Sequence, residues 1–353
     1  MPARLKDIAH DLGLSVITVS KVLRNHPDIS EKTRERVLKR VKELDYQPNY
    51  AARALITGRT STIGLVVPDL LHPFFANIAK SISKEIQAKD YSLLISSSDE
   101  EPELEQKEIH QLIARRIDVL ILASVQQTAK GLGHLAARKV PYILVDRFFT
   151  ELASNFIGVD DRAVGVLATS HLIEQGCKHI AHIRGPEVST AIGRLEGFKE
   201  TLALHQMAPM DGHIVSIGSS GDHRGEEAGY EAARHFLSHR TRPDGIFCFN
   251  DPVALGAMRA ILEAGLRIPE DIAVVGCGNL SYSDFLRIPL SSVDQGSARI
   301  GSAAARMALK MAQDRVQLPS ETELIEPRIV VRASSLRRPP QSQAKTEYQV
   351  AGI

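Results

Sequence analysis

The sequence lacks the features that mark several large classes of protein. Its three cysteines show no CxxC spacing, which argues against a disulfide framework or a zinc site and suits a reducing compartment. No apolar run reaches transmembrane length, and the charged, polar start shows no export signal, so we expect a cytoplasmic protein without a membrane partner. No GxGxxG or GxxxxGKS/T motif and no convincing catalytic cluster occur, which predicts no enzyme, no cofactor and no metal.

Charge is nearly balanced over the whole chain but not along it. The formal net charge is +1, yet residues 1–60 contain twelve Lys and Arg against seven Asp and Glu. The first sixty residues therefore have a net charge of +5, and the remainder has a net charge of −4. This asymmetry is typical of a phosphate-binding module attached to a nearly neutral body.

Residues 4–23 form two short stretches with helical spacing of apolar residues, broken at Gly13. Gly13 allows a left-handed turn, and Ser15 is a suitable N-cap for the second stretch. A third helix is predicted to begin at Ser30 and to close a small three-helix core. The expected core residues are Ile8, Ala9, Leu12, Val19, Val22, Leu23, Val37, Val41 and Leu44. We therefore predict an all-α helix-turn-helix head over residues 1–47.

The outer face of the second helix is predicted to read DNA. If its apolar residues Val19, Val22 and Leu23 point inward, the opposite side is formed by Ser15, Val16, Ile17, Thr18 and Lys21. Two β-branched apolar residues on such a face suit contact with thymine methyl groups, while Thr18 and Lys21 suit phosphates or base acceptors. The alternative is that Val16 or Ile17 completes the core of the head.

These motifs resemble the head of the LacI/GalR family of bacterial transcription regulators. The matching stretches are Lys6–Ala9, Ser15–Ser20, Ile29–Arg34 and Leu44–Asn49, followed by Ala51–Thr60, which is similar to the family's hinge helix. The resemblance implies that Asn49 contacts DNA and that Leu55 is a wedge in the minor groove. Residues 48–60 are then the hinge and linker. Because a helix over residues 49–57 is too short to be stable alone, we expect its folding to be coupled to dimerisation and DNA bending.

From Thr62 onward, short apolar runs alternate with amphipathic stretches. Near-continuous apolar strands between helices predict parallel sheets covered on both faces, which is a doubly wound α/β fold. The length of residues 61–336 favours two subdomains with a cleft between them. Residues 337–353 contain Pro339 and Pro340 among polar residues and are predicted to be a disordered tail.

The family resemblance extends over this body, which is similar to periplasmic sugar-binding proteins of type I. It implies one subdomain of residues 61–160 and 292–322 and another of residues 161–290 and 323–336. It also implies a ligand cleft at the carboxyl ends of the strands. The cleft residues carried over are Phe74, Phe75, Asp146, Arg194, Asn250 and Gln295.

An aromatic platform with Asp, Arg and Asn around it suits a polyhydroxylated ligand. Two alternatives stand beside that interpretation: Phe74 and Phe75 as core residues, and Asp146 with Arg194 as a structural ion pair. The chain also departs from the family, because Gly278 replaces one of the acidic residues that many relatives carry.

The residues and the resemblance together predict a homodimeric transcription factor, most simply a repressor, on a pseudo-palindromic double-stranded operator. A small-molecule effector, expected to be a sugar or sugar derivative, would control it from the cleft. The alternative is control by a phosphocarrier protein or by a non-sugar co-repressor such as a purine. Induction and co-repression both use the same cleft and stay open. A periplasmic solute-binding protein is disfavoured because it has no use for the basic head.

Overall fold

The computed structural model describes residues 3–23, 26–46, 54, 58–133, 135, 138, 140–218, 224–314 and 320–337. The chain divides into two compact units, a head of residues 1–60 and a body of residues 61–353. This division coincides with the predicted end of the linker at residue 60. Two of the predicted DNA-binding residues, Asn49 and Leu55, lie outside the described residues.

The head contains the predicted helix-turn-helix. Its helices are α1 (Leu5–Leu12), α2 (Val16–Leu23) and α3 (Glu31–Glu43). Gly13 ends α1 in the left-handed region, with φ of 62° and ψ of 33°, and the Ser15 hydroxyl accepts a 3.0 Å hydrogen bond from the Thr18 N–H. The buried residues of the head are Ile8, Ala9, Val19, Val22 and Val37, with Leu12, Leu23, Val41 and Leu44 packed against them. The predicted fold of the head is confirmed.

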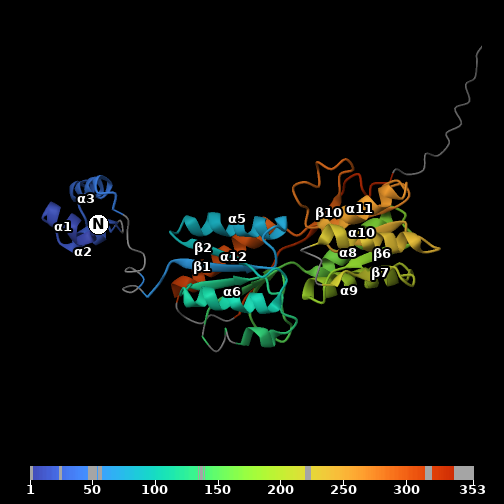
Figure 1. Ribbon diagram of the computed structural model, residues 1–353, viewed down its shortest axis with the longest axis horizontal. Coiled ribbons are helices and arrows are strands. Elements are labelled where there is room, and N and C mark those ends of the chain that lie inside the picture. Colours follow the sequence, from blue (N-terminus) through green and yellow to red (C-terminus); the bar gives the residue numbers. More distant parts are fainter. Residues whose placement is uncertain are drawn as a thin grey trace, which may run out of the picture. The chain divides into compact units, whose positions relative to one another are not determined.

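The first subdomain of the body is built on a six-stranded sheet with the order β11-β5-β4-β3-β1-β2. All of its paired strands are parallel. The strands are β1 (Thr62–Val67), β2 (Ser92–Ser97), β3 (Val119–Leu122), β4 (Tyr142–Val145), β5 (Asn155–Gly158) and β11 (Thr322–Leu324). The accompanying helices are α5 (Pro73–Gln87), α6 (Pro102–Ala114) and α12 (Ser297–Asp314), with a 3-10 turn, η1 (Ala129–Leu132). Helix α12 packs against α5, and Figure 1 shows α5 on one side of this sheet and α6 on the other.

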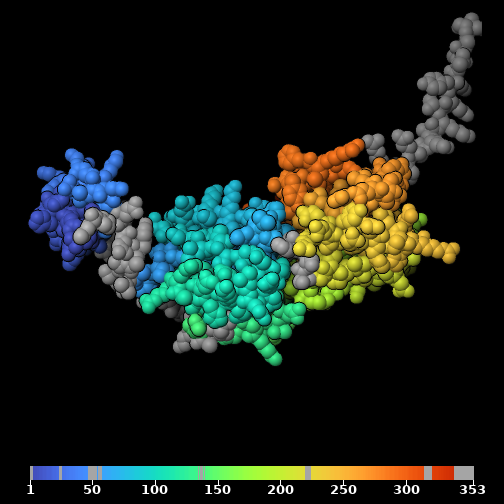
Figure 2. All heavy atoms as spheres, in the orientation of Figure 1, coloured from blue at the N-terminus to red at the C-terminus, as the bar shows by residue number. Residues whose placement is uncertain are grey.

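The second subdomain repeats this plan with the strand order β12-β10-β9-β8-β6-β7, in which only β12 runs antiparallel to its neighbour. The strands are β6 (Ile180–Arg184), β7 (Ile214–Ser216), β8 (Gly245–Cys248), β9 (Ala273–Cys277), β10 (Ser291–Asp294) and β12 (Arg328–Val330). The helices are α8 (Asp161–Glu174), α9 (Ser189–Leu204), α10 (Gly225–Ser238) and α11 (Asp251–Glu263). Within the body, the two subdomains form separate masses of atoms, blue-green and yellow to orange in Figure 2. The predicted two-subdomain α/β fold is confirmed.

The chain passes between the two subdomains three times: after β5, after β10, and between β11 and β12. Two of these crossings differ from the boundaries expected from the resemblance. Strand β10 pairs with β9 and β12, so residues 292–294 belong to the second sheet rather than the first. Strand β11 pairs with β5, so residues 323–324 belong to the first sheet. Strand pairing decides these boundaries, and it is not visible in the local apolar pattern.

The expected disordered tail begins one residue too early. Arg337 belongs to the folded body, because its backbone N–H donates to the Gln175 side chain and its guanidinium Nε donates to the Pro269 carbonyl, both over 3.0 Å. The remaining tail residues, 338–353, lie outside the described part of the chain.

Helices α8 and α9 pack at close range through two glycines. A Cβ on Gly165 would lie 2.2 Å from the Arg194 carbonyl oxygen, and a Cβ on Gly197 would lie 2.1 Å from the Arg162 carbonyl oxygen. Any other residue at either position would therefore push the helices apart. This close approach brings the beginning of α8, which includes Asp161, against Arg194 on α9.

Candidate functional site

The outer face of α2 exposes two apolar side chains. The side chain of Val16 is 44% exposed and that of Ile17 is 68% exposed, so the alternative that either completes the core is wrong. Ser15 is exposed, Thr18 is half-buried, and the Lys21 ammonium lies 3.4 Å from an Asp28 carboxylate oxygen. Exposed β-branched residues beside hydroxyl and ammonium groups make a surface that suits the major groove of DNA.

All six predicted cleft residues line one small cavity between the two subdomains, which we call the central cavity. Its volume is about 20 Å³. The lining residues are His72, Phe74, Phe75, Asp146, Arg147, Thr190, Arg194, Phe249, Asn250, Cys277, Gly278 and Gln295. Half of them directly follow the carboxyl end of a strand: Asp146 and Arg147 after β4, Phe249 and Asn250 after β8, Gly278 after β9, and Gln295 after β10. This is where parallel α/β sheets place their ligands.

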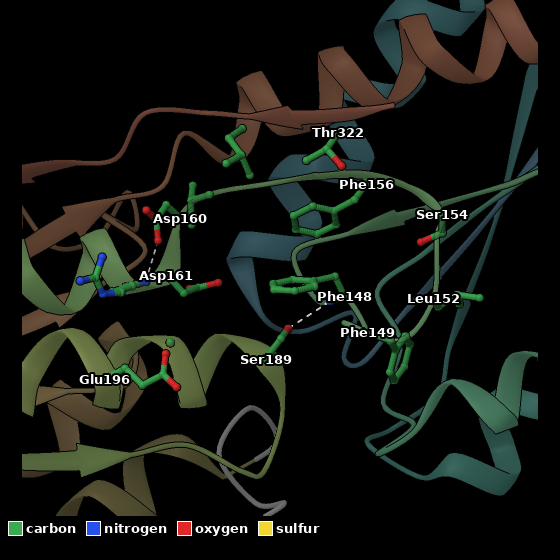
Figure 3. Close-up of a pocket in the computed structure, with 14 residues that line it drawn as sticks. Phe148, Phe149, Leu152, Ser154, Phe156, Asp160, Asp161, Ser189, Glu196 and Thr322 are labelled. Atoms are coloured by element: carbon green, nitrogen blue, oxygen red, sulfur yellow. Dashed lines mark hydrogen bonds between the residues drawn. The ribbon is translucent and has the colours of Figure 1, made fainter. Parts of the chain in front are cut away.

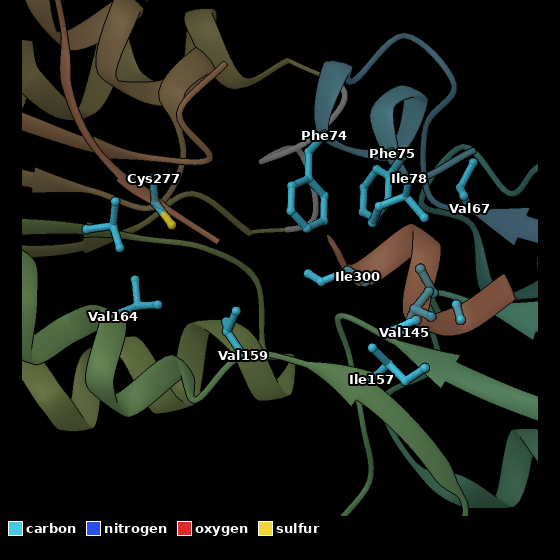
Figure 4. Close-up of a cluster of buried hydrophobic side chains, with 14 of the residues drawn as sticks. Val67, Phe74, Phe75, Ile78, Val145, Ile157, Val159, Val164, Cys277 and Ile300 are labelled. Atoms are coloured by element: carbon cyan, nitrogen blue, oxygen red, sulfur yellow. The ribbon is translucent and has the colours of Figure 1, made fainter. Parts of the chain in front are cut away.

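The two phenylalanines belong both to the cavity wall and to the core. Phe74 and Phe75 lie in the first turn of α5, are 4% and 3% exposed, and meet edge to face with ring centroids 5.2 Å apart. Figure 4 shows them side by side near Ile78, with Cys277 of the second subdomain facing Phe74. Phe74 and Phe75 are therefore core residues, as one interpretation of the sequence held, and they also line the cavity. Their contact with a ligand stays a prediction.

Arg194 is held by an ion pair, but its partner is not the one considered from the sequence. Its Nε donates to Asp161 Oδ1 over 3.0 Å, and its Nη1 donates to the Phe249 carbonyl over 2.7 Å. The guanidinium carbon also lies 4.8 Å from the centre of the Phe249 ring. Asp161 was missed because it lies 33 positions away in the sequence and no local signal marks it as a partner. Burial raises the pKa of Asp161 to about 6, although Arg194 favours its charged form.

Asp146 lies in a second buried charge cluster. Arg147, the next residue, forms a 3.0 Å ion pair with Glu100 and approaches Asp146 at 3.8 Å. Burial and the negative charge of Asp161 raise the pKa of Asp146 to about 6. Burial also lowers the pKa of His72 to about 4, so this imidazole is neutral at pH 7. Together, the central cavity and its ion-pair partners contain three carboxylates and two guanidiniums.

On the cavity wall, Thr190 Oγ1 and Gln295 Nε2 are buried polar atoms with no hydrogen-bond partner in the described part of the chain. Such atoms are costly to bury unless a ligand or solvent satisfies them. Thr190 lies one helical turn before Arg194 on α9, and this i, i+4 spacing was the signal that could have identified it. Gly278 lies on the wall with φ of 126°, and it supplies no carboxylate there.

The cysteines and histidines that the structure describes give no sign of a metal centre. Cys177, Cys248 and Cys277 are buried free thiols whose pKa values are raised by burial. Within the described ranges, no group of three or more His, Cys, Asp and Glu side chains has metal-binding geometry. In the same part of the chain, no helix has the length and hydropathy needed to span a bilayer.

A larger cavity, of about 390 Å³, lies beside the central one, and we call it the flank pocket (Figure 3). It is lined by Phe148, Phe149, Leu152, Ser154, Phe156, Val159, Asp160, Asp161, Arg162, Ser189, Gly193, Glu196, Thr322 and Leu324. None of the six residues predicted from the sequence lines it. It meets the central site at Asp161, the ion-pair partner of Arg194.

Two family models match the chain. Residues 4–49 match the model described as "Bacterial regulatory proteins, lacI family", and residues 169–335 match the model of a periplasmic binding protein-like domain. The ribose operon repressor of Halalkalibacterium halodurans is 34% identical over 312 residues, which cover 88% of this chain and 91% of that protein. The transcriptional repressor PurR of Histophilus somni is 32% identical over 336 residues, covering 94% and 98% of the two chains.

A solved structure resembles the whole chain. The crystal structure of the lac repressor dimer bound to operator and the anti-inducer ONPF superimposes with a TM-score of 0.83 at 27% identity. The match covers 96% of this chain and 100% of that one. With a helix-turn-helix head, a two-subdomain body and relatives above 30% identity, the chain belongs to the lacI family of bacterial regulatory proteins and is a DNA-binding transcription regulator with an effector-binding body.

Proposed function

We propose that this regulator binds a pseudo-palindromic operator as a homodimer, with the outer face of α2 in the major groove. The exposure of Ile17, at 68%, carries this proposal, because folding of the head gives that apolar side chain no partner. Val16 shares its role, and Ser15, Thr18 and Lys21 position the helix on phosphates and bases. The printed title of the lac repressor structure, a dimer bound to operator, supports the same assembly here.

Asn49 and Leu55 complete the proposed DNA-binding set, with Leu55 wedged between base steps in the minor groove. Leu55→Ala should weaken specific operator binding by about 1 to 3 kcal/mol and leave salt-driven binding to random DNA nearly unchanged. Gel-shift titration on operator and on random duplexes measures both affinities. Equal losses on the two DNAs would remove the wedge role.

We further propose that the effector is an uncharged polyhydroxylated molecule, such as a sugar, in the central cavity. Both arginines there are already paired, Arg194 with Asp161 and Arg147 with Glu100, each at 3.0 Å. The third carboxylate, on Asp146, leaves the cluster with an excess of negative charge, which disfavours a phosphate or carboxylate on the ligand. Thr190, Gln295 and Asp146 instead offer a hydroxyl, an amide N–H and a carboxylate to ligand hydroxyl groups.

Binding of such a ligand must change the arrangement of the subdomains or the side chains in the cleft. The present cavity of about 20 Å³ holds roughly one water molecule, whereas sites for small molecules usually measure about 300 to 1,000 Å³. Phe74 and Phe75 come from one subdomain, whereas Arg194 and Asn250 come from the other. The ligand therefore has different affinities for the two arrangements, which is the condition for control of DNA binding.

A thermal-shift panel on the full chain tests the proposed effector class. Ribose, the neutral sugar in the printed name of a relative, is compared with ribose 5-phosphate and with hypoxanthine, which is a neutral purine. The panel also includes other hexoses and pentoses. We expect one of these neutral sugars to raise the Tm and the phosphate ester of that sugar to leave the Tm unchanged. Stabilisation by sugar phosphates alone would contradict the proposal.

A planar neutral purine is the second candidate, and the rings of Phe74 and Phe249 on the cavity wall favour it. In that case hypoxanthine, rather than any sugar, should raise the Tm. Operator titrations with and without the stabilising compound then distinguish induction from co-repression by the direction of the affinity change.

A further inference from the structure

We propose that the flank pocket is a second ligand site, separate from the central cavity, for a small molecule that joins a flat apolar ring to a cationic amine. Its volume of about 390 Å³ falls within the range of small-molecule sites. The pocket is therefore large enough for such a ligand without the rearrangement that the central cavity requires.

One wall of the pocket is aromatic. Phe148, Phe149 and Leu152 follow β4, and Phe156 lies in β5. The rings of Phe148 and Phe156 have centroids 5.0 Å apart, and Phe148 remains 37% exposed. Figure 3 shows Phe148 and Phe156 together on the same side of the pocket. Exposed ring faces attract both another flat ring and a cation.

The opposite wall is acidic. Among the described residues, its charged groups are Asp160, Asp161 and Glu196 with one cation, Arg162, whose guanidinium is bound by Glu200. The charge of the lining therefore favours a cationic ligand over a neutral or anionic one. Figure 3 shows Asp161 and Glu196 on the side of the pocket formed by the second subdomain.

Asp161 provides a built contact point for that cation. The residue is 5% exposed, and its Oδ1 accepts from Arg194. Its other oxygen, Oδ2, is buried and has no hydrogen-bond partner within the described ranges. An ammonium group in the flank pocket would satisfy this oxygen.

The site is placed to influence regulation because its walls come from both subdomains. The Phe148 N–H of the first subdomain donates to the Ser189 hydroxyl of the second over 3.0 Å, as the dashed line in Figure 3 marks. Asp161 also links the flank pocket to Arg194 in the central cavity. A ligand here favours the arrangement of subdomains that forms the pocket, whatever the effector in the central cavity is.

The test uses the full-length protein and two probes of similar size and opposite charge, 2-phenylethylammonium and 3-phenylpropanoate. Saturation-transfer NMR and calorimetry measure their affinities. A probe of about nine heavy atoms should bind in the millimolar range, and we expect the ammonium to bind at least about tenfold more tightly than the carboxylate. No saturable binding of the ammonium, or equal affinity for both probes, would overturn the proposal.

Matched variants locate the bound probe. Phe148→Ala should weaken ammonium binding by about fivefold, and the exposed Glu196→Gln by about threefold. Glu227→Gln, an exposed change on α10, and Gln295→Ala, on the central cavity, should leave it unchanged. Because Glu196 is exposed, its variant tests the site even if Phe148→Ala does not fold. Loss of binding in Gln295→Ala, with full binding in Glu196→Gln, would place the probe in the central cavity and refute a second site.

Discussion

The outer face of α2 exposes an apolar side chain, whereas the central cavity of the body buries a charged one. Ile17 is apolar and 68% exposed, whereas Arg194 is charged and 3% exposed. Exposed large apolar groups and buried polar groups are the two departures from ordinary burial that carry information. On α2 the proposed partner of Ile17 is DNA, outside the chain, whereas Arg194 has partners within the chain, at Asp161 and Phe249.

In the head, DNA recognition should therefore be separable from stability, whereas in the body the ligand site and the fold depend on the same residues. A change at Ile17 removes no packing, so it should affect DNA recognition alone. A change at Asp161 or Arg194 leaves a buried charge without its partner, so it should affect the fold as well as the ligand site. Single substitutions in the two regions test this contrast.

Asp161→Asn should destabilise the body most, by about 3 to 5 kcal/mol, because it leaves a buried guanidinium that cannot lose its proton. Urea unfolding followed by circular dichroism measures the change in the free energy of unfolding. The exposed ion pair Arg259 with Glu263 supplies a matched control in Glu263→Gln, which should change stability by less than about 1 kcal/mol. Similar small losses for both variants would show that burial of the pair matters little.

Arg194→Met should cost less, about 1 to 3 kcal/mol, because the Asp161 left behind can take up a proton. Its pKa is already raised to about 6 beside the guanidinium, so loss of Arg194 raises it further. The effector response should also disappear, while operator affinity without effector stays nearly the same. A variant that melts lower but responds fully would make Arg194 a purely structural residue.

The variant His182→Phe tests whether a buried polar side chain in the body can be purely structural rather than part of a ligand site. The rings of His182 and Phe247 stack with their centroids 4.6 Å apart, and His182 lines neither the central cavity nor the flank pocket. Burial lowers the pKa of His182 to about 3. The unfolded chain binds a proton on this histidine below about pH 6.5 while the folded chain does not, so its contribution to stability is complete above that pH and is lost as pH falls.

As the pH falls from about 6 to 5, the free energy of unfolding of His182→Phe should therefore rise relative to that of the wild type by about 1.4 kcal/mol for each pH unit. Urea unfolding of both proteins at each pH gives this difference, in which the opposite contributions of Asp146 and Asp161 cancel. A difference that does not change with pH would show that His182 titrates normally in the folded protein.

Ile17→Ala should have the smallest effect on folding, within about 0.5 kcal/mol, because the side chain is exposed. Specific operator affinity should nevertheless fall, and replacing a contacted thymine by uracil should weaken wild type but not the variant. A double-mutant cycle in a binding titration measures this coupling. An unfolded head, with unchanged base preference in the surviving molecules, would return Ile17 to the core.

The sequence predicted the elements more reliably than the contacts between them. The helices of the head, the left-handed Gly13 and the Ser15 cap follow from residues within one or two turns of each other, and all are present. All six residues expected in the cleft do line a single cavity. The errors lie at strands β10 and β11, which joined sheets other than those expected, and at Arg337.

Apolar spacing, caps and turn residues alone determined that this chain has a three-helix basic head and an α/β body, because each signal acts between near neighbours. The pairing of Arg194 with Asp161 rather than Asp146, and the second cavity beside them, depend instead on how the helices pack. The reason is the close crossing of α8 and α9 at Gly165 and Gly197, which brings together residues 33 positions apart. The approach of two helices depends on the packing of the whole subdomain, so no local pattern records it.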